Sequence, residues 1–172
     1  FNPDSGEAMK SGLLTGLLLL WVSAATASAT LKPFVSASLQ QIITSRQGAP
    51  FILVLWSIDC PPCLQELARL QQLRTQFHAT SLVLVSTDEM QMADEVAQLL
   101  SDFELDQMDS WIFAESIPER LRYAIDPAWY GELPRAYFYS SGDQRIAHSG
   151  SLNYAVLQQW LQQNQLNANA SG

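Results

Sequence analysis

The sequence predicts an α/β fold, with a central mixed sheet flanked by helices. Two apolar runs, at residues 51–56 and 81–86, lack polar alternation, which is typical of strands covered on both faces. Apolar side chains at helical spacing follow each run, and this alternation of strand and helix favours parallel pairing. A hairpin pattern before residue 149 adds antiparallel strands. The composition, 48% hydrophobic and 15% charged over 172 residues, is typical of a single globular domain.

A secretory signal pattern occupies residues 9–29. It has one positive charge, a short apolar core over Leu13–Val22, and small residues ending in Ala27-Ser28-Ala29. The apolar core is short for a membrane span of ~20 residues, so we expect cleavage rather than an uncleaved anchor. Residues 1–8 are expected to lie upstream of the translated protein. The mature chain would be periplasmic, with no stable membrane span and one domain over residues 30–166.

The first helix is predicted around Leu39, Ile42 and Ile43, and it ends at Gln47-Gly48-Ala49-Pro50. The central strand Phe51–Trp56 follows directly. These elements lead into the stretch that carries the chemistry.

The next helix begins with Cys60-Pro61-Pro62-Cys63, and its apolar face comprises Leu64, Leu67, Leu70, Leu73 and Phe77. Prolines are tolerated in a first turn, where the N–H groups have no partner inside the helix. Cys60 falls near the N-cap, where the helix dipole favours a thiolate, so we predict that Cys60 attacks and the inward-facing Cys63 resolves the mixed disulfide. Pro62 lacks an N–H that could have bonded the Cys60 sulfur, which leaves the Cys63 N–H as the nearest donor.

Two other functions of this cysteine pair are less well supported. A zinc site would need further ligands, but there is no second cysteine pair, and His78 and His148 stand alone. A structural disulfide closing so short a loop would stabilise the fold by only about 2 kcal/mol in the loop-entropy model. We therefore predict a redox-active disulfide and no metal.

The remaining elements continue the α/β pattern. Ser81–Ser86 is predicted as a second strand parallel to the first, followed by a core-facing helical stripe of Val96, Leu99, Leu100 and Phe103. A short strand at Trp111–Ala114 and a helix at Pro118–Ala124 come next. The chain closes with a hairpin around Ser141-Gly142-Asp143, a helix marked by Leu157, Trp160 and Leu161, and a tail, residues 167–172, expected to be disordered.

The stretch from Trp56 to Glu66, Trp-Ser-Ile-Asp-Cys-Pro-Pro-Cys-Leu-Gln-Glu, resembles the active site of the thioredoxin superfamily, and most of all its TlpA/ResA-like branch. In that branch a tryptophan stands four residues before the first cysteine, and a glutamate often stands three residues after the second. The resemblance extends from about Phe34 to about Leu161. It departs from thioredoxins proper at Val54, where they have a buried aspartate, and at Asp59, where they usually have tryptophan.

This resemblance implies a thioredoxin-like fold and several site residues. The Leu133-Pro134 bond would be cis and face the cysteines, so that the preceding backbone could pair with a substrate chain; the alternative is a trans proline at a strand start. Glu66 would either relay a proton to and from Cys63, or be a solvated acid favoured by the helix dipole. Further residues are candidates for shaping or lining the substrate groove, or else for packing: Trp56, Pro61, Pro62, Trp129, Tyr130 and Leu133.

The predicted function is exchange of electrons with protein thiols and disulfides, supplied by an upstream redox donor. No cofactor is needed, because the sulfur pair itself carries the electrons. The resemblance implies a reductant of the kind that serves cytochrome c biogenesis or copper-site assembly. The alternative is a copper metallochaperone that binds Cu(I) through Cys60, Cys63 and a histidine.

The charge pattern excludes some partners. The formal net charge is −8, and no Lys or Arg occurs between Arg74 and Arg120. An acidic protein is poorly suited to bind nucleic acid or anionic membranes. We expect a monomer.

Overall fold

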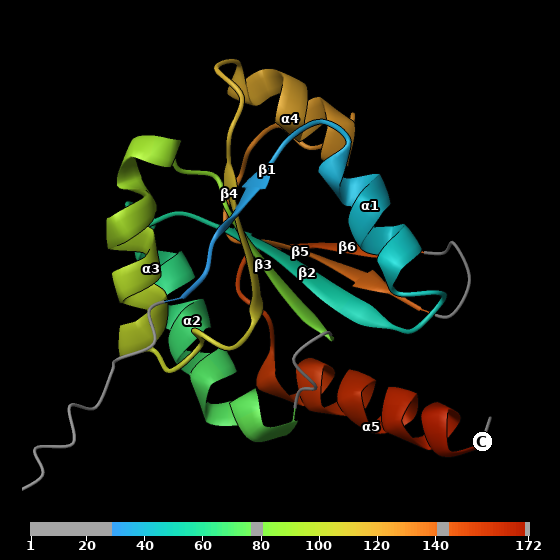
Figure 1. The fold of residues 1–172 in the computed structure, drawn as a ribbon. Coiled ribbons are helices and arrows are strands. Elements are labelled where there is room, and N and C mark those ends of the chain that lie inside the picture. The colour runs from blue at the N-terminus through green and yellow to red at the C-terminus, as the bar shows by residue number, and fades with distance from the viewer. Residues whose placement is uncertain (1–28, 77–80, 141–144, 171–172) are drawn as a thin grey trace, which may run out of the picture.

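The computed structural model describes residues 29–76, 81–140 and 145–170; for residues 165–170 it describes the backbone alone. One six-stranded mixed sheet, in the order β1-β4-β3-β2-β5-β6, forms the centre of the domain, and helices cover both of its faces (Figure 1). This arrangement confirms the predicted fold class.

The strands are short and the helices alternate with them along the chain. The strands are β1 Lys32–Phe34, β2 Phe51–Trp56, β3 Leu82–Ser86, β4 Asp109–Phe113, β5 Arg135–Tyr139 and β6 Arg145–Ser149. The helices are α1 Ser38–Ser45, α2 Pro61–Leu73, α3 Ala93–Asp102, α4 Pro118–Ile125 and α5 Tyr154–Ala170, with single 3₁₀ turns at Arg74–Gln76 and Met90–Met92.

Strand β2 is the centre of the sheet. It pairs in parallel with β3 and antiparallel with β5, and all six of its residues are buried. Ile52, Val54 and Trp56 face the core under α2, α3 and α5, while its other side chains face the core under α1 and α4. Both faces of β2 therefore exclude water, as the unbroken apolar run predicts.

Two elements differ from the sequence prediction. Strand β1 was not expected; it pairs in parallel with β4 at the edge of the sheet and buries Phe34 completely. Helix α5 is longer than expected, since the tail predicted to be disordered from Asn167 is helical as far as Ala170. No Gly or Pro interrupts the sequence between Leu161 and Ala170, so nothing local breaks the helix there.

Several sequence predictions fall outside the described residues. They concern the signal pattern, the Phe77 end of the active-site helix, His78, and the hairpin turn at residues 141–144. Across the described ranges, no helix is both long enough and apolar enough to cross a membrane.

Candidate active site

The cysteine pair lies where β2 ends and α2 begins. Cys60 is the N-cap of α2, in extended conformation with φ −112° and ψ 95°, and the two prolines occupy the first helical positions. The two cysteines are joined by a disulfide with a Cα–Cα distance of 5.1 Å. The site is thus assembled by one continuous stretch of chain, at the carboxyl end of the central strand.

The two sulfurs differ in exposure. Cys63 is fully buried in the core beneath α2, whereas Cys60 is partly exposed at the surface between Asp59 and Pro61. The Cys63 N–H donates to the Cys60 sulfur at 3.2 Å and to the Cys60 carbonyl at 2.8 Å. Cys60 is therefore the more exposed residue of the pair, and the donor that contacts its sulfur is the one expected from the Pro-Pro sequence.

The Leu133-Pro134 peptide bond is cis, as the resemblance implies. Strand β5 starts at the next residue, and Arg135 pairs with Leu55, so Pro134 lies level with the carboxyl end of β2. Leu133 and Cys60 both pack against the core cluster beneath α2. The proline therefore lies at the same edge of the sheet as the cysteine turn.

Glu66 is buried, so the prediction of a solvated acid is wrong. Only 1% of the residue is exposed, and one carboxylate oxygen, Oε2, accepts hydrogen bonds from the Leu152 N–H at 2.9 Å and from Arg69 Nη1 at 3.2 Å. No described group bonds the other oxygen, Oε1. Burial raises the pKa of this carboxyl, against the opposing effects of the Leu152 N–H, the Arg69 charge and the His148 charge.

His148 has a place that the sequence did not reveal. It pairs with Ala136 across β5 and β6, which puts it on the sheet face that carries α2. Its Nε2 lies 3.2 Å from the Ser151 carbonyl, in the segment that also supplies the Leu152 N–H to Glu66. The period-2 alternation of the hairpin was the available signal for this placement.

Trp56 and Trp129 are packing residues, the alternative to a groove position that the sequence left open. Trp56 is 1% exposed and lies in the core beneath the motif. Trp129 is 4% exposed, packs in the core on the opposite face of the sheet, and donates from Nε1 to the Glu132 carbonyl at 2.9 Å. Trp129 therefore does not line the groove, because its loop turns the ring inward; Tyr130, at 92% exposed, points outward. Pro61 and Pro62 are exposed beside Cys60.

Asp88 is a site residue that sequence reasoning missed. Its carboxylate accepts hydrogen bonds from Ser57 Oγ at 2.7 Å, the Ile58 N–H at 3.1 Å and Ser86 Oγ at 2.6 Å. The signal was its position just beyond β3, because neighbouring parallel strands end at the same edge of a sheet.

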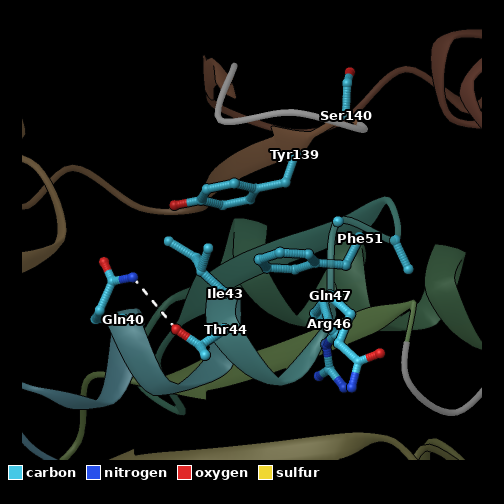
Figure 2. A pocket seen from close by; sticks show the side chains of 10 residues that line it. Gln40, Ile43, Thr44, Arg46, Gln47, Phe51, Tyr139 and Ser140 are labelled. Carbon is cyan, nitrogen blue, oxygen red and sulfur yellow. Dashed lines mark hydrogen bonds between the residues drawn. The ribbon is translucent and has the colours of Figure 1, made fainter.

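Three surface hollows lie away from the cysteines. One of about 560 Å³ lies beside Ser36, Glu115 and Arg120. One of about 460 Å³ lies at the amino end of β2, opposite to the cysteine turn, beside the stacked rings of Phe51 and Tyr139, whose centroids are 4.3 Å apart (Figure 2). Another, of about 340 Å³, extends from Asp88 towards Pro118. Within the described part of the chain, no three His, Cys, Asp or Glu side chains are grouped so that they could hold a metal ion.

The sequence matches no protein-family model and no curated protein. Solved structures match the fold at low identity. A thiol:disulfide interchange protein of the thioredoxin family from Chlorobium tepidum TLS gives a TM-score of 0.56 at 18% identity, over 80% of this chain and 90% of that one. A DsbF homologue from Corynebacterium diphtheriae gives 0.55 at 14% identity, over 70% and 75% of the two chains.

A secreted disulfide oxidoreductase from Mycobacterium tuberculosis, homologous to E. coli DsbE, gives a TM-score of 0.51 at 16% identity, over 69% of this chain and 84% of that one. Likeness at this level establishes the architecture. The chain therefore has a thioredoxin-like α/β fold, with a Cys60–Cys63 disulfide at the start of its second helix.

Proposed function

We propose that this protein is an exported thiol–disulfide oxidoreductase that acts on protein thiols and disulfides. The observation that carries the proposal is the partly exposed Cys60 at the amino terminus of α2, joined by a disulfide to the fully buried Cys63. A thiolate at a helix N-terminus is stabilised by the dipole and is the attacking form in disulfide exchange. The fold shared with known oxidoreductases supports the same chemistry.

In the proposed reaction, the Cys60 thiolate attacks a substrate disulfide, forms a mixed disulfide and releases one substrate thiolate. The Cys63 thiolate then attacks Cys60 Sγ, which releases the second substrate thiolate and restores the Cys60–Cys63 disulfide. Two electrons pass to the substrate, and an upstream redox donor must reduce the pair again. The reverse sequence would oxidise a substrate dithiol.

Glu66 is the proposed proton acceptor for the Cys63 thiol. Cys63 is buried and must lose its proton before it attacks, and Glu66 lies one helical turn further along α2, also buried. A raised pKa suits a carboxyl that both takes and returns a proton. Val54 occupies the strand position where thioredoxins proper carry an aspartate for this task.

We infer that the protein works as a reductant. Pro61 and Pro62 have no N–H groups, so of the first three helical residues only Cys63 donates to the Cys60 sulfur. A less stabilised thiolate favours the disulfide form, and such a pair gives up its electrons readily. By resemblance to TlpA/ResA-like proteins, the proposed substrates are periplasmic proteins whose cysteines must be reduced during cytochrome c biogenesis or copper-site assembly.

A Cys63→Ala variant should accumulate mixed disulfides between Cys60 and partner proteins, because the resolving sulfur is gone; non-reducing gels and mass spectrometry of a periplasmic extract would detect them. The wild type should also accelerate insulin reduction by dithiothreitol. The matched control is the double variant Cys60→Ala/Cys63→Ala, which should do neither.

Recovery of no mixed disulfide, together with no insulin reduction, would contradict the proposed function. Stoichiometric Cu(I) binding with no exchange activity would favour the metallochaperone instead. Cell fractionation tests export separately, since a protein found only in the cytoplasm would remove the periplasmic part of the proposal.

A further inference from the structure

We propose that Asp88 is a positioning residue of the redox site. Its carboxylate fixes the turn from Ser57 to Cys60 and keeps a negative charge there, which favours the disulfide over the Cys60 thiolate. This inference rests on the proposed function and explains how the pair would be poised as a reductant.

The first support is the number and type of hydrogen bonds that converge on Asp88. Oδ1 accepts from Ser57 Oγ at 2.7 Å, while Oδ2 accepts from the Ile58 N–H at 3.1 Å and from Ser86 Oγ at 2.6 Å. The Asp88 N–H in turn donates to Ser86 Oγ at 3.0 Å, and Ser86 is fully buried at the end of β3. The carboxylate is therefore anchored to the sheet and holds two consecutive residues of the motif.

The second support is the path from these bonds to Cys60. Ser57 Oγ, which donates to Asp88, also accepts from the Asp59 N–H at 3.2 Å. The Ser57 carbonyl accepts from the Cys60 N–H at 3.3 Å. Ser57 thus links the Asp88 carboxylate to the backbone N–H groups of Asp59 and of Cys60, the N-cap residue.

The third support is charge. The Asp88 carboxylate carries a negative charge beside the turn, partly shielded from water, and Asp59 adds an exposed carboxyl on the turn itself. A like charge near a thiol disfavours ionisation of that thiol. The described donors to the Asp88 carboxylate are two hydroxyls and one backbone N–H, and none of them is a basic side chain. The charge is therefore solvated by dipoles rather than neutralised by a counter-ion.

The test compares three variants in the reduced full-length protein. Asp88→Asn removes the charge and keeps the size of the side chain. Ser57→Ala removes one donor and leaves the charge less well solvated. Asp102→Asn, on the exposed surface of α3, is the control for an equal change in net charge. The readouts are the pH midpoint of Cys60 alkylation by iodoacetamide, located by mass spectrometry, and the equilibrium constant with glutathione.

Asp88→Asn should lower the alkylation midpoint by about half a pH unit relative to Asp102→Asn, and should shift the glutathione equilibrium about threefold towards the reduced protein. A threefold change corresponds to about 14 mV for a two-electron couple. Ser57→Ala should move the midpoint in the opposite direction. A purely structural role would loosen the turn in both variants and move both midpoints the same way.

Equal midpoints for Asp88→Asn and Asp102→Asn, or shifts of the same sign for Asp88→Asn and Ser57→Ala, would overturn the inference. If Asp88→Asn does not fold, Ser57→Ala decides alone, and a midpoint that is unchanged or lowered counts against Asp88. Alkylation does not require exchange activity, so these results are distinct from a failure of the insulin assay, which would instead remove the proposed function.

Discussion

The Glu66 carboxyl combines nearly complete burial with only partial compensation of its charge. Arg69 contacts Oε2 but is itself about one-third exposed, with a side-chain exposed fraction of 36%. The ionised form of a buried carboxyl costs free energy that one N–H and one partly solvated guanidinium do not fully return. The pKa of such a group is raised, so it stays protonated to higher pH than a surface glutamate, which agrees with the proton-acceptor role proposed for Glu66.

This property predicts a pH-dependent stability difference between the wild type and Glu66→Gln. The folded-state pKa of Glu66 is raised above its ordinary value of 4.5 by burial, so the stability that this residue contributes is complete below pH 4.5 and is lost as pH rises through the folded-state pKa. The free energy of unfolding of Glu66→Gln minus that of the wild type should therefore increase from pH 4 to pH 8. Urea denaturation at several pH values measures it; a pH-independent difference would contradict the buried, raised-pKa carboxyl.

Pro62 is a second residue whose effect can be measured directly. Replacing it by alanine restores an N–H in the first turn of α2, beside the Cys60 sulfur. A hydrogen bond to a charged group contributes about 1.5–3 kcal/mol, so the equilibrium constant with glutathione should shift by about tenfold or more towards the reduced protein. Pro61→Ala is the matched control, because its N–H would lie one position nearer the N-cap; an equal shift in both variants would argue against this hydrogen bond.

At the scale of elements, helix α2 holds the cysteines by its packing. Cys63, Leu67, Leu70 and Leu73 are fully buried, while the two prolines at its start are exposed. The buried face fixes the helix against the sheet, and this leaves the N-terminal turn open to solvent. The turn from Ser57 to Cys60, the redox turn, is thus presented at the surface by a helix whose opposite face is packed in the core.

Leu67→Ala should therefore lower the free energy of unfolding by about 2–5 kcal/mol, the usual range for a buried leucine. Gln65→Ala, an exposed position on the same helix, should change it by less than about 0.5 kcal/mol. Chemical denaturation of both variants measures the difference. Similar losses for the two positions would show that α2 does not pack as described.

How much of this structure the sequence could predict depends on how local the determinants are. The buried strand Phe51–Trp56 and the Cys-Pro-Pro-Cys turn were predictable, because neighbouring residues alone produce their patterns. Strand β1 was not, since it has only three residues with a proline in the middle, and its pairing partner β4 lies far along the chain.

The same reasoning applies to the site. Glu66 reads as a surface acid in its own helix, and it is buried by a segment 86 residues away. Asp88 reaches the motif across 30 residues of sequence. Trp129, which the sequence left open between lining the groove and packing, is buried in the core on the opposite face of the sheet, and its loop has no periodicity that could reveal this direction. Local pattern therefore identified the sulfurs, and tertiary contacts determined what surrounds them.

At the scale of the whole molecule, charge governs encounter with partners. The formal net charge is −8, and a field of this sign attracts basic polypeptides and slows the approach of acidic ones. Because Asp59 and Asp88 belong to the redox turn and its neighbour, the same bias operates close to Cys60.

The expected result is that a disulfide peptide flanked by lysines is reduced several-fold faster than its glutamate-flanked analogue at low ionic strength. The two rates should converge near 1 M salt, where the screening length is about 3 Å. Stopped-flow measurement of peptide reduction at a series of salt concentrations tests this. A rate ratio that does not change with salt would point to local contacts rather than to the overall field.

One short segment joins the two halves of the candidate site. The Gly150 N–H donates to the Pro134 carbonyl at 2.9 Å, and the Leu152 N–H donates to Glu66 at the same distance. Because these donors are only two residues apart, we expect that one residue inserted between them would break one of the two hydrogen bonds, whereas exposed loop tips tolerate insertions. The length of this segment therefore links the position of the proline loop to that of the buried carboxylate.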